Sequence, residues 1–232
     1  MVFVIAEIGV NWDGNFSLVQ EMMKKSKEIG CDAVKFQAYD ESILGDHPQK
    51  KRLLKSAIST ENVDEINSIS KEIGIEWICT PMYPHAVDFL DSYVKRYKIR
   101  TFDGKSLVNN QSTELFERIL ETKKEIIVSS EISPKDSTFY NHPLIKWLYC
   151  VPKYPCDLTD LNFKNFNDFN GYSNHCPNII APLFSVISGA QILEIHVTNN
   201  KSEDFIDNSV SFDFVELKKL IDQIHDYEKI IH

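Results

Sequence analysis

The sequence lacks the features that mark several large classes of protein. Its 232 residues contain no apolar run near the roughly 18–20 residues that a transmembrane helix needs. No basic segment precedes the first apolar run, which reaches Glu7 within a few residues, unlike a secretory signal. The five cysteines include no CxxC pair, which disfavours a zinc ribbon or a redox dithiol. We therefore expect a soluble cytoplasmic protein whose cysteines are reduced.

Positive charge is also scarce. The chain has 25 Lys+Arg against 34 Asp+Glu, a net charge of −9, so no overall positive field attracts nucleic acid. Eight glycines and nine prolines exclude a collagen-like or low-complexity chain, and a hydrophobic content of 43% is enough for a core. The length lies near the lower end for a (β/α)8 barrel, roughly 200 to over 400 residues. We expect one domain over residues 1–232, with neither nucleic acid nor membrane as a partner.

Short apolar runs alternate with helical patterns along the whole chain. The predicted strands are 2–8, 33–36, 75–79, 97–101, 125–128, 144–151, 170–172 and 192–196. The predicted helices are 18–29, 63–73, 84–94, 112–122, 179–187 and 214–231. Such alternation favours a parallel sheet with right-handed crossovers, and eight units favour a closed barrel over an open sheet. No GxGxxG or GxxxxGK[ST] motif follows the first strand, which also disfavours a nucleotide-binding open sheet.

Two of the predicted crossovers are weak. Segment 133–143 is short and holds two prolines, and segment 159–169 is rich in Asn, Asp and Phe, so neither predicts a full helix. The expected fold class is therefore α/β, a reduced (β/α)8 TIM barrel with shortened fifth and sixth crossovers.

Polar side chains stand at or just after the end of each predicted strand. In a parallel barrel these ends share one mouth, where catalytic groups from several strands meet. For any single position, a polar residue leaving the core is the simpler explanation. Lys35 and Glu194 are harder to explain in that way, because they sit within apolar runs and buried charges need partners. The candidates for one polar pocket are Glu7, Lys35, Thr80, Lys98, Thr101, Ser129, Ser130, Tyr154, Ser173, His175, Glu194 and His196.

Two kinds of ligand suit these residue types. Lys35 and Lys98, with neighbouring hydroxyl groups, could hold a small anion such as a phosphate or a carboxylate. His175 and His196 end neighbouring strands and could share a divalent metal, with Glu7 or water completing its shell. Imidazole and oxygen ligands suit Mn, Fe, Co or Zn about equally. Two unrelated histidines remain the alternative.

The same residues form a recognisable series of motifs. Among them are Ile5-Ala-Glu-Ile-Gly-Val-Asn11, Val34-Lys-Phe-Gln37, Gly171-Tyr-Ser-Asn-His175 and Glu194-Ile-His-Val-Thr198. In order and spacing, the chain resembles the sialic acid synthase family (N-acetylneuraminate synthase and its legionaminate and pseudaminate relatives) from residue 3 to about 220. The resemblance implies a (β/α)8 barrel that condenses phosphoenolpyruvate with an N-acetylated amino sugar like N-acetylmannosamine. The products would be a nine-carbon 2-keto sugar acid and phosphate.

The resemblance also implies roles for individual residues. The metal would be divalent, usually Mn²⁺, with Mg²⁺ or Co²⁺ as alternatives, and one of the two glutamates would handle protons. The implied sets are His175 and His196 for the metal; Lys35, Lys98, Ser129 or Ser130, and Ser173 for phosphoenolpyruvate; Tyr154 and Asp207 for the amino sugar; and Glu7, Glu194 and Lys35 at the reacting centre. Thr80 and Thr101 would add hydroxyl groups to the substrate pocket.

Several positions depart from the family pattern. Trp12, Asn174, Ile195 and Asn208 stand where the family usually has His, Asp, Lys and His, and the segment 151–153 replaces its usual Cys-Thr-Ser/Asn. These departures leave open a different acceptor sugar or a degenerate, non-catalytic barrel that binds a sugar or a partner subunit. A barrel aldolase that uses Lys35 or Lys98 as a Schiff base, or a 2-keto acid synthase with another acceptor, is a further alternative.

Family members also carry a C-terminal antifreeze-like (SAF) domain that caps the barrel of a partner subunit. The present sequence ends at His232, directly after the last predicted helix, and we expect no such domain within it. A homo-oligomer and a separate capping partner both stay open.

Overall fold

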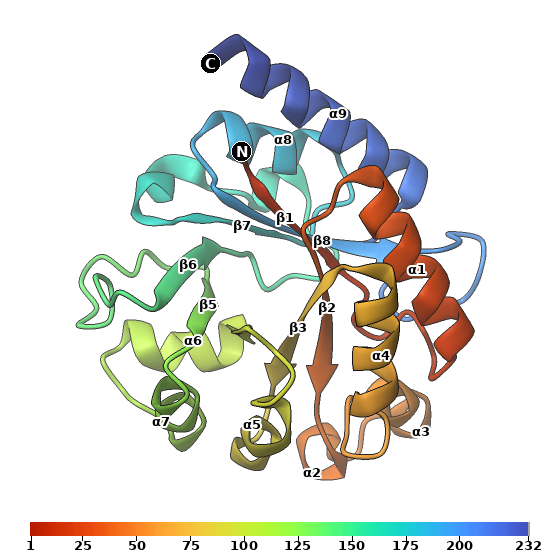
Figure 1. Ribbon diagram of the computed structural model, residues 1–232. Coiled ribbons are helices and arrows are strands. Elements are labelled where there is room, and N and C mark those ends of the chain that lie inside the picture. Colours follow the sequence, from red (N-terminus) through yellow and green to blue (C-terminus); the bar gives the residue numbers. More distant parts are fainter. Residues whose placement is uncertain (232) are drawn as a thin grey trace.

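The computed structural model describes residues 1–231 and contains a closed ring of parallel strands surrounded by helices (Figure 1). Within these residues β1 pairs with both β2 and β8, which closes an eight-stranded barrel. The barrel strands are β1 (Phe3–Glu7), β2 (Ala33–Ala38), β3 (Glu76–Pro81), β4 (Arg96–Ile99), β5 (Glu125–Ser130), β6 (Ile145–Tyr149), β7 (Gly171–Asn174) and β8 (Ile192–Thr198). The predicted TIM barrel is confirmed.

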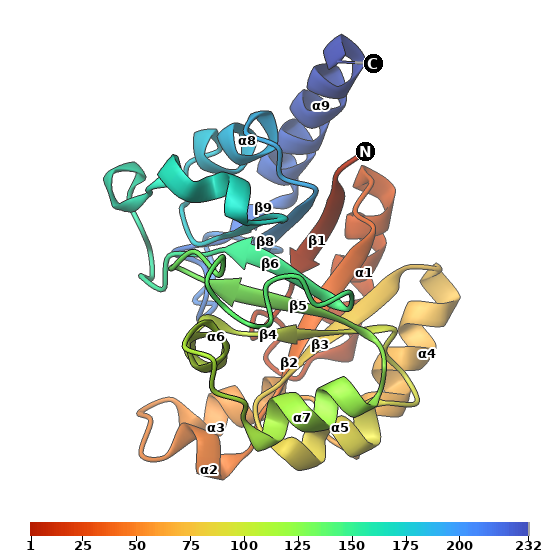
Figure 2. The same ribbon diagram turned by 90° about the vertical axis from the view of Figure 1, so that its left-hand side faces the viewer.

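The helices cover the outside of the barrel. A short ninth strand, β9 (Phe212–Asp213), pairs with the end of β8 (Figure 2). The helices are α1 (Phe16–Ile29), α2 (Glu41–Leu44), α3 (Lys50–Leu53), α4 (Val63–Ile73), α5 (Pro84–Leu90), α6 (Thr101–Val108), α7 (Glu114–Glu121), α8 (Ile180–Ile187) and α9 (Phe214–Ile231), with the 3₁₀ helices η1 (Leu54–Ser56), η2 (Leu158–Asp160) and η3 (Phe163–Asp168). In the described part of the chain, no helix combines the length and the apolar character that crossing a bilayer requires.

Local signals explain where the regular helices begin and end. The side chain of Asn15 caps α1 by accepting hydrogen bonds from the backbone N–H groups of Ser17 and Leu18. Gly30 ends the helix with φ at 99°, a conformation that a glycine adopts without steric cost. Thr113 caps α7, one residue later than the predicted start of that helix.

The short helices α2 and α3 were not predicted, and neither was α6. The segment from Thr101 was expected to end a strand, but β4 ends at Ile99 and Thr101 begins α6. Only Gly104 and Leu107 of α6 are buried, so the helix leaves almost no apolar periodicity in the sequence.

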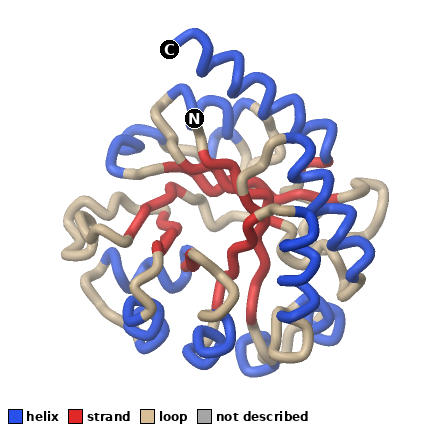
Figure 3. The backbone as a smooth tube through the Cα atoms, viewed as in Figure 1, coloured by secondary structure: helices blue, strands red, loops and turns tan. Residues whose placement is uncertain are grey.

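The two weak crossovers are as irregular as the sequence predicts. No helix lies between β5 and β6 in the described residues, and only the 3₁₀ helices η2 and η3 lie between β6 and β7 (Figure 3). Aromatic side chains cover the barrel where a helix would otherwise pack. The ring of Tyr149 lies 5.4 Å from Phe163 and 5.5 Å from Phe169, centroid to centroid.

Inside the barrel, an apolar layer lies toward the amino ends of the strands, below a polar pocket at their carboxyl ends. Because side chains alternate along a strand, every second residue points inward. The lower inward positions form one apolar cluster, made of Ile5, Ala33, Ile78, Ile127, Leu148 and Ile192, with Phe3 packed against it. Beneath it, the guanidinium of Arg96 lies 2.7 Å from Glu76, 2.6 Å from Glu125 and 4.6 Å from the ring centroid of Phe3. This charged cluster closes the bottom of the barrel, and the polar pocket lies on the other side of the apolar layer.

The close approach of β7 to β8 gives a test of this packing. A Cβ atom at Gly171 would lie 2.0 Å from the carbonyl oxygen of Ile192, whereas one at Gly74 would meet no atom within 4 Å. Gly171→Ala should therefore lower the free energy of unfolding in urea by more than about 3 kcal/mol, as severe overpacking does. Gly74→Ala, at φ 73°, should cost only about 1–2 kcal/mol of backbone strain. Equal losses in the two variants would contradict this close approach of the two strands.

Candidate active site

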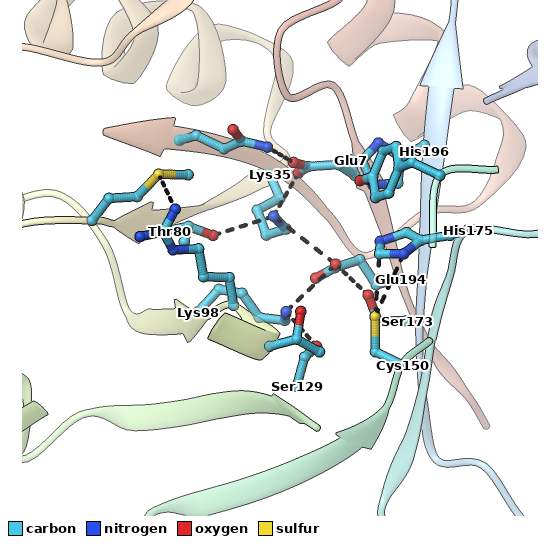
Figure 4. Close-up of a pocket in the computed structure, with 15 residues that line it drawn as sticks. Glu7, Lys35, Thr80, Lys98, Ser129, Cys150, Ser173, His175, Glu194 and His196 are labelled. Carbon is cyan, nitrogen blue, oxygen red and sulfur yellow. Dashed lines mark hydrogen bonds and ion pairs between the residues drawn. The ribbon is translucent and has the colours of Figure 1, made fainter. Parts of the chain in front are cut away.

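A polar pocket of about 250 Å³ opens at the carboxyl ends of the barrel strands (Figure 4). Its walls combine cations, carboxylates, hydroxyl groups, a thiol and two imidazoles. The lining residues are Glu7, Lys35, Gln37, Thr80, Met82, Lys98, Arg100, Thr101, Ser129, Cys150, Tyr154, Ser173, His175, Glu194 and His196. Side chains separated by up to 189 positions along the chain thus meet in one cavity.

Two predicted site residues do not line this pocket. The hydroxyl of Ser130 donates a 2.7 Å hydrogen bond to the carbonyl of Ile132, so it faces the fifth crossover. Ser129, next to it on β5, points into the pocket instead, as alternation along a strand requires. Asp207 lies behind His196, with 3.4 Å between its Oδ2 atom and the Nδ1 atom of the imidazole.

The structure adds four lining residues that were not predicted for the site: Gln37, Met82, Arg100 and Cys150. The alternation of side chains along a strand could have predicted two of these four residues. Gln37 stands two residues after Lys35, and Arg100 stands two residues after Lys98, which places each on the same wall as its lysine.

Lys35 is buried between two carboxylates. Its Nζ atom lies 2.9 Å from Oε2 of Glu7 and 3.9 Å from Oε1 of Glu194, and it donates a 3.2 Å hydrogen bond to Thr80. Burial alone would lower the pKa of Lys35, but the charges of Glu194 and Glu7 outweigh that effect and raise it. Lys35 therefore stays charged, and the expectation that this lysine and Glu194 have charged partners is confirmed.

Glu194 is the carboxylate that joins the two lysines. Its Oε1 atom lies 3.6 Å from Nζ of Lys98 and accepts a 2.8 Å hydrogen bond from Ser173. Burial would raise the pKa of Glu194, but the charges of Lys35 and Lys98 outweigh burial and lower it to about 2. Glu194 is therefore ionised at neutral pH and is a weak base.

Lys98 differs from Lys35 in its balance of charges. Burial lowers its pKa, the charge of Glu194 compensates only in part, and the nearby charge of Lys35 lowers the pKa further. Its Nζ atom donates a 2.7 Å hydrogen bond to the hydroxyl of Ser129. Of the two buried lysines, Lys98 is thus the one that loses its proton more readily.

The two predicted metal ligands lie side by side, with 5.4 Å between the ring centroids of His175 and His196. Burial lowers the pKa of His175 to about 4, so its imidazole is neutral at pH 7. The Nδ1 atom of His175 lies 2.7 Å from the carbonyl oxygen of Val151, which assigns the proton to Nδ1 and leaves the lone pair on Nε2. In His196, Nε2 lies 2.7 Å from the hydroxyl of Tyr154, and Nδ1 is buried without a hydrogen bond.

These imidazoles suit a metal that has only two protein ligands. A neutral histidine that donates its other N–H to a backbone carbonyl is the usual arrangement of a metal-bound imidazole. Among residues 1–231, no group of three or more His, Cys, Asp or Glu side chains is arranged to hold an ion. The free Nε2 lone pair of His175 suits a divalent metal, whereas Nε2 of His196 is in contact with the hydroxyl of Tyr154, and an ion held by both imidazoles would need water or substrate in its remaining positions.

The positions that depart from the family pattern lie outside the pocket lining. Trp12 is fully buried in the core, where its ring packs against Phe16 and Phe36. The amide of Asn174 closes a turn through two hydrogen bonds to the backbone of Cys176. Ile195 belongs to the core between the strands and the helices. Trp12, Asn174 and Ile195 are thus buried behind the site and do not belong to its inner wall.

Comparison with known proteins identifies the family of the chain. The sequence pattern of the NeuB family matches residues 22–232. The chain belongs to the NeuB family. It is 30% identical to an uncharacterised protein of Methanocaldococcus jannaschii, over 99% of this chain and 72% of that protein. It is 29% identical to the N,N'-diacetyllegionaminic acid synthase of Legionella pneumophila, over 99% and 73%, and 28% identical to a pseudaminic acid synthase of Campylobacter jejuni, over 99% and 75%.

Solved structures of similar proteins share the fold of this NeuB family member. The N-acetylneuraminic acid (sialic acid) synthetase of Leptospira borgpetersenii superposes with a TM-score of 0.86 at 25% identity, covering 99% of this chain and 85% of that one. A truncated 3-deoxy-D-arabino-heptulosonate 7-phosphate synthase of Thermotoga maritima superposes with a TM-score of 0.67 at 11% identity, covering 99% and 87%. The second likeness concerns the barrel alone.

The buried neutral state of His175 predicts a pH dependence of stability in the metal-free protein. The unfolded chain binds a proton at this residue below pH 6.5, but the folded chain binds it only near pH 4. The contribution of His175 to the free energy of unfolding is therefore fully present above pH 6.5, and it falls by on the order of 3 kcal/mol as the pH drops to about 4. Urea unfolding in EDTA should show this loss in the wild type and a smaller one in His175→Asn.

The exposed His85 provides the control, since His85→Asn should leave the pH profile unchanged. The low pKa of Glu194 contributes to stability in a separate window, lost only as the pH falls from 4.5 to about 2. Identical profiles for the wild type and His175→Asn between pH 6.5 and 4 would refute the assignment of a buried neutral imidazole.

Proposed function

We propose that this protein condenses phosphoenolpyruvate with an N-acetylated amino sugar of the N-acetylmannosamine type. The products are a nine-carbon 2-keto sugar acid and phosphate. The observation that carries the proposal is one pocket that joins Lys35, Lys98 and two carboxylates to a pair of neighbouring imidazoles. Membership of the NeuB family supports it, as do relatives named for the synthesis of legionaminic and pseudaminic acids.

The reaction has three bond changes. C3 of phosphoenolpyruvate attacks the aldehyde carbon of the open-chain sugar, and the aldehyde oxygen takes up a proton. Water adds to the cation left at C2 and gives up a proton. The bond between C2 and the phosphate oxygen then breaks as the C2 hydroxyl gives its proton to the departing phosphate, which leaves the ketone.

The charged residues of the pocket match these needs. Lys35 and Lys98, with Ser129 and Ser173, offset the negative charges of phosphoenolpyruvate. Glu194 stays ionised because its pKa is lowered to about 2, so its charge stabilises the cation at C2 and its basicity contributes little. We assign the proton from the attacking water to Glu7, which is held by Lys35 and by a 2.7 Å hydrogen bond from Gln37.

His175 and His196 are the proposed ligands of a divalent metal, which we take to be Mn²⁺, with Mg²⁺ or Co²⁺ as alternatives. When bound there, such an ion would polarise the aldehyde carbonyl. Tyr154, which lines the pocket beside His196, would face the amino sugar, whereas Asp207 lies behind His196 and would act on the sugar only through that imidazole. A cytoplasmic setting belongs to the proposal, since all five cysteines are free thiols.

One observation favours a second candidate function. A lysine with a lowered pKa in a buried pocket can form a Schiff base with a carbonyl substrate, and Lys98 has both properties. A barrel aldolase that uses Lys98 would have no need of the two imidazoles as metal ligands.

The synthase proposal predicts phosphate release that depends on the acceptor. Purified protein with Mn²⁺, phosphoenolpyruvate and N-acetylmannosamine or a related N-acetylated sugar should release phosphate. Lys98→Met should slow the release roughly 100-fold or more, because it removes a cation that binds the charged substrate. Lys71→Met, on the exposed surface of α4, is the matched control and should leave the rate unchanged. No release with any acceptor, from protein that binds Mn²⁺, would favour a non-catalytic barrel.

Metal removal separates the two candidate reactions. Under the synthase proposal, EDTA should abolish phosphate release and added Mn²⁺ should restore it, while His196→Ala should remain inactive at any Mn²⁺ concentration. Borohydride added with pyruvate should leave the mass of the protein unchanged. Activity that survives EDTA, together with a reduced pyruvate adduct that Lys98→Met lacks, would establish the aldolase instead.

A further inference from the structure

Arg100 is a cation in the pocket that neither the sequence motifs nor the proposed mechanism uses. It follows β4 directly, two residues after Lys98, and its side chain lines the same cavity. Its side chain is 32% exposed, compared with 4% for that of Lys98. Arg100 therefore lies nearer the opening of the pocket, on the wall that carries Lys98.

The guanidinium of Arg100 is paired with an oxygen atom of the described residues through its Nε atom. Its Nε atom donates a 2.7 Å hydrogen bond to Asp103, and the ring of Phe102 lies 5.1 Å from its Cζ atom. Nη1 lies 3.3 Å from the sulfur of Met82, which is a weak acceptor. Among residues 1–231, no oxygen atom accepts a hydrogen bond from either Nη atom of Arg100. The side chain is thus oriented by its neighbours, while its Nη edge keeps its donors for a ligand.

The surrounding charges favour an anion at this edge. The cations that line the pocket are Lys35, Lys98 and Arg100, whereas the lining carboxylates are Glu7 and Glu194, both engaged by the lysines. Asp103 contacts the Nε side of Arg100 and does not line the cavity. Among the lining residues the cations therefore outnumber the carboxylates by one, and Asp103, behind the wall, offsets only part of the charge of Arg100.

The donors beside Arg100 suit a phosphate group better than a carboxylate. Lys98, with the hydroxyl groups of Thr101 and Ser129, belongs to the same side of the pocket, on β4, the start of α6 and the end of β5. A phosphate monoester is close to a dianion at neutral pH and offers three oxygen acceptors. A guanidinium binds two such oxygens in one plane, and a lysine can bind the third as a point charge.

We propose that Arg100 binds the phosphate group of a phosphate monoester and, with Lys98, determines the affinity of the pocket for it. This inference rests on the proposed function for its most direct source, phosphoenolpyruvate. A phosphorylated acceptor sugar would present the same chemistry to the same residue.

Calorimetric titration measures this contact without catalysis. Inorganic phosphate and phosphoenolpyruvate are titrated separately into wild type, Arg100→Gln, Arg100→Lys and Arg118→Gln. Arg100→Gln should weaken both affinities at least tenfold, and Arg100→Lys should give an intermediate loss, because it keeps the charge but not the planar fork. Arg118→Gln is the matched control and should bind like the wild type, since Arg118 pairs with Asp88 on the outer helices.

The same titrations identify the source of the phosphate. N-acetylmannosamine and its 6-phosphate are the added ligands. If Arg100→Gln weakens the affinity for inorganic phosphate and phosphoenolpyruvate but not for the sugar phosphate, Arg100 binds phosphoenolpyruvate. If it weakens the affinity for inorganic phosphate and the sugar phosphate but not for phosphoenolpyruvate, Arg100 binds the acceptor.

Other outcomes would overturn the inference. Wild-type affinity for inorganic phosphate in Arg100→Gln, in protein that melts like the wild type, would show that Arg100 makes no phosphate contact. Failure of the wild type to bind any of the phosphate ligands would also overturn the inference. The proposed function fails separately: a protein that binds phosphate through Arg100 but releases none with any acceptor supports this inference and refutes the synthase.

Discussion

The pairing of Lys35 and Lys98 with Glu7 and Glu194 is the constraint that shapes the upper half of the barrel. Each ion would cost several kcal/mol if it were buried alone, so no member of the set can be removed without leaving an uncompensated charge. The carboxylates also need hydrogen-bond donors, which Gln37 supplies to Glu7. The polar lining of the pocket thus follows from placing two ammonium groups inside a barrel.

The apolar layer below the pocket increases the effect of these charges. Ile5, Ile78 and Leu148 exclude water from the space under the network, and the Arg96 cluster closes the bottom. Electrostatic interactions are stronger in such surroundings than in water. The same layer lets one barrel hold a carboxylate with a pKa near 2 and an imidazole with a pKa near 4 in a single cavity.

The sequence predicts the barrel and most of the pocket because both depend on local patterns. Apolar runs mark the strands, and the alternation of side chains along a strand brings the polar residues that follow them to one mouth. What escapes prediction depends on packing across the chain. Ser129 and Ser130 are equivalent in sequence, and only the register of β5 turns the first inward. Arg100 stands where β4 ends and α6 begins, and that boundary is hard to predict because α6 buries too few residues to leave a periodic pattern.

The closed bottom of the barrel affects how molecules reach the site. Because the lower end is closed, molecules enter and leave the pocket through its upper end. Lys98 and Glu194 are 3% exposed, whereas Tyr154, beside His196, is 48% exposed, so the first two lie deeper than the tyrosine. A molecule seated on Lys98 and Glu194 would therefore lie farther from the opening than one that rests against Tyr154.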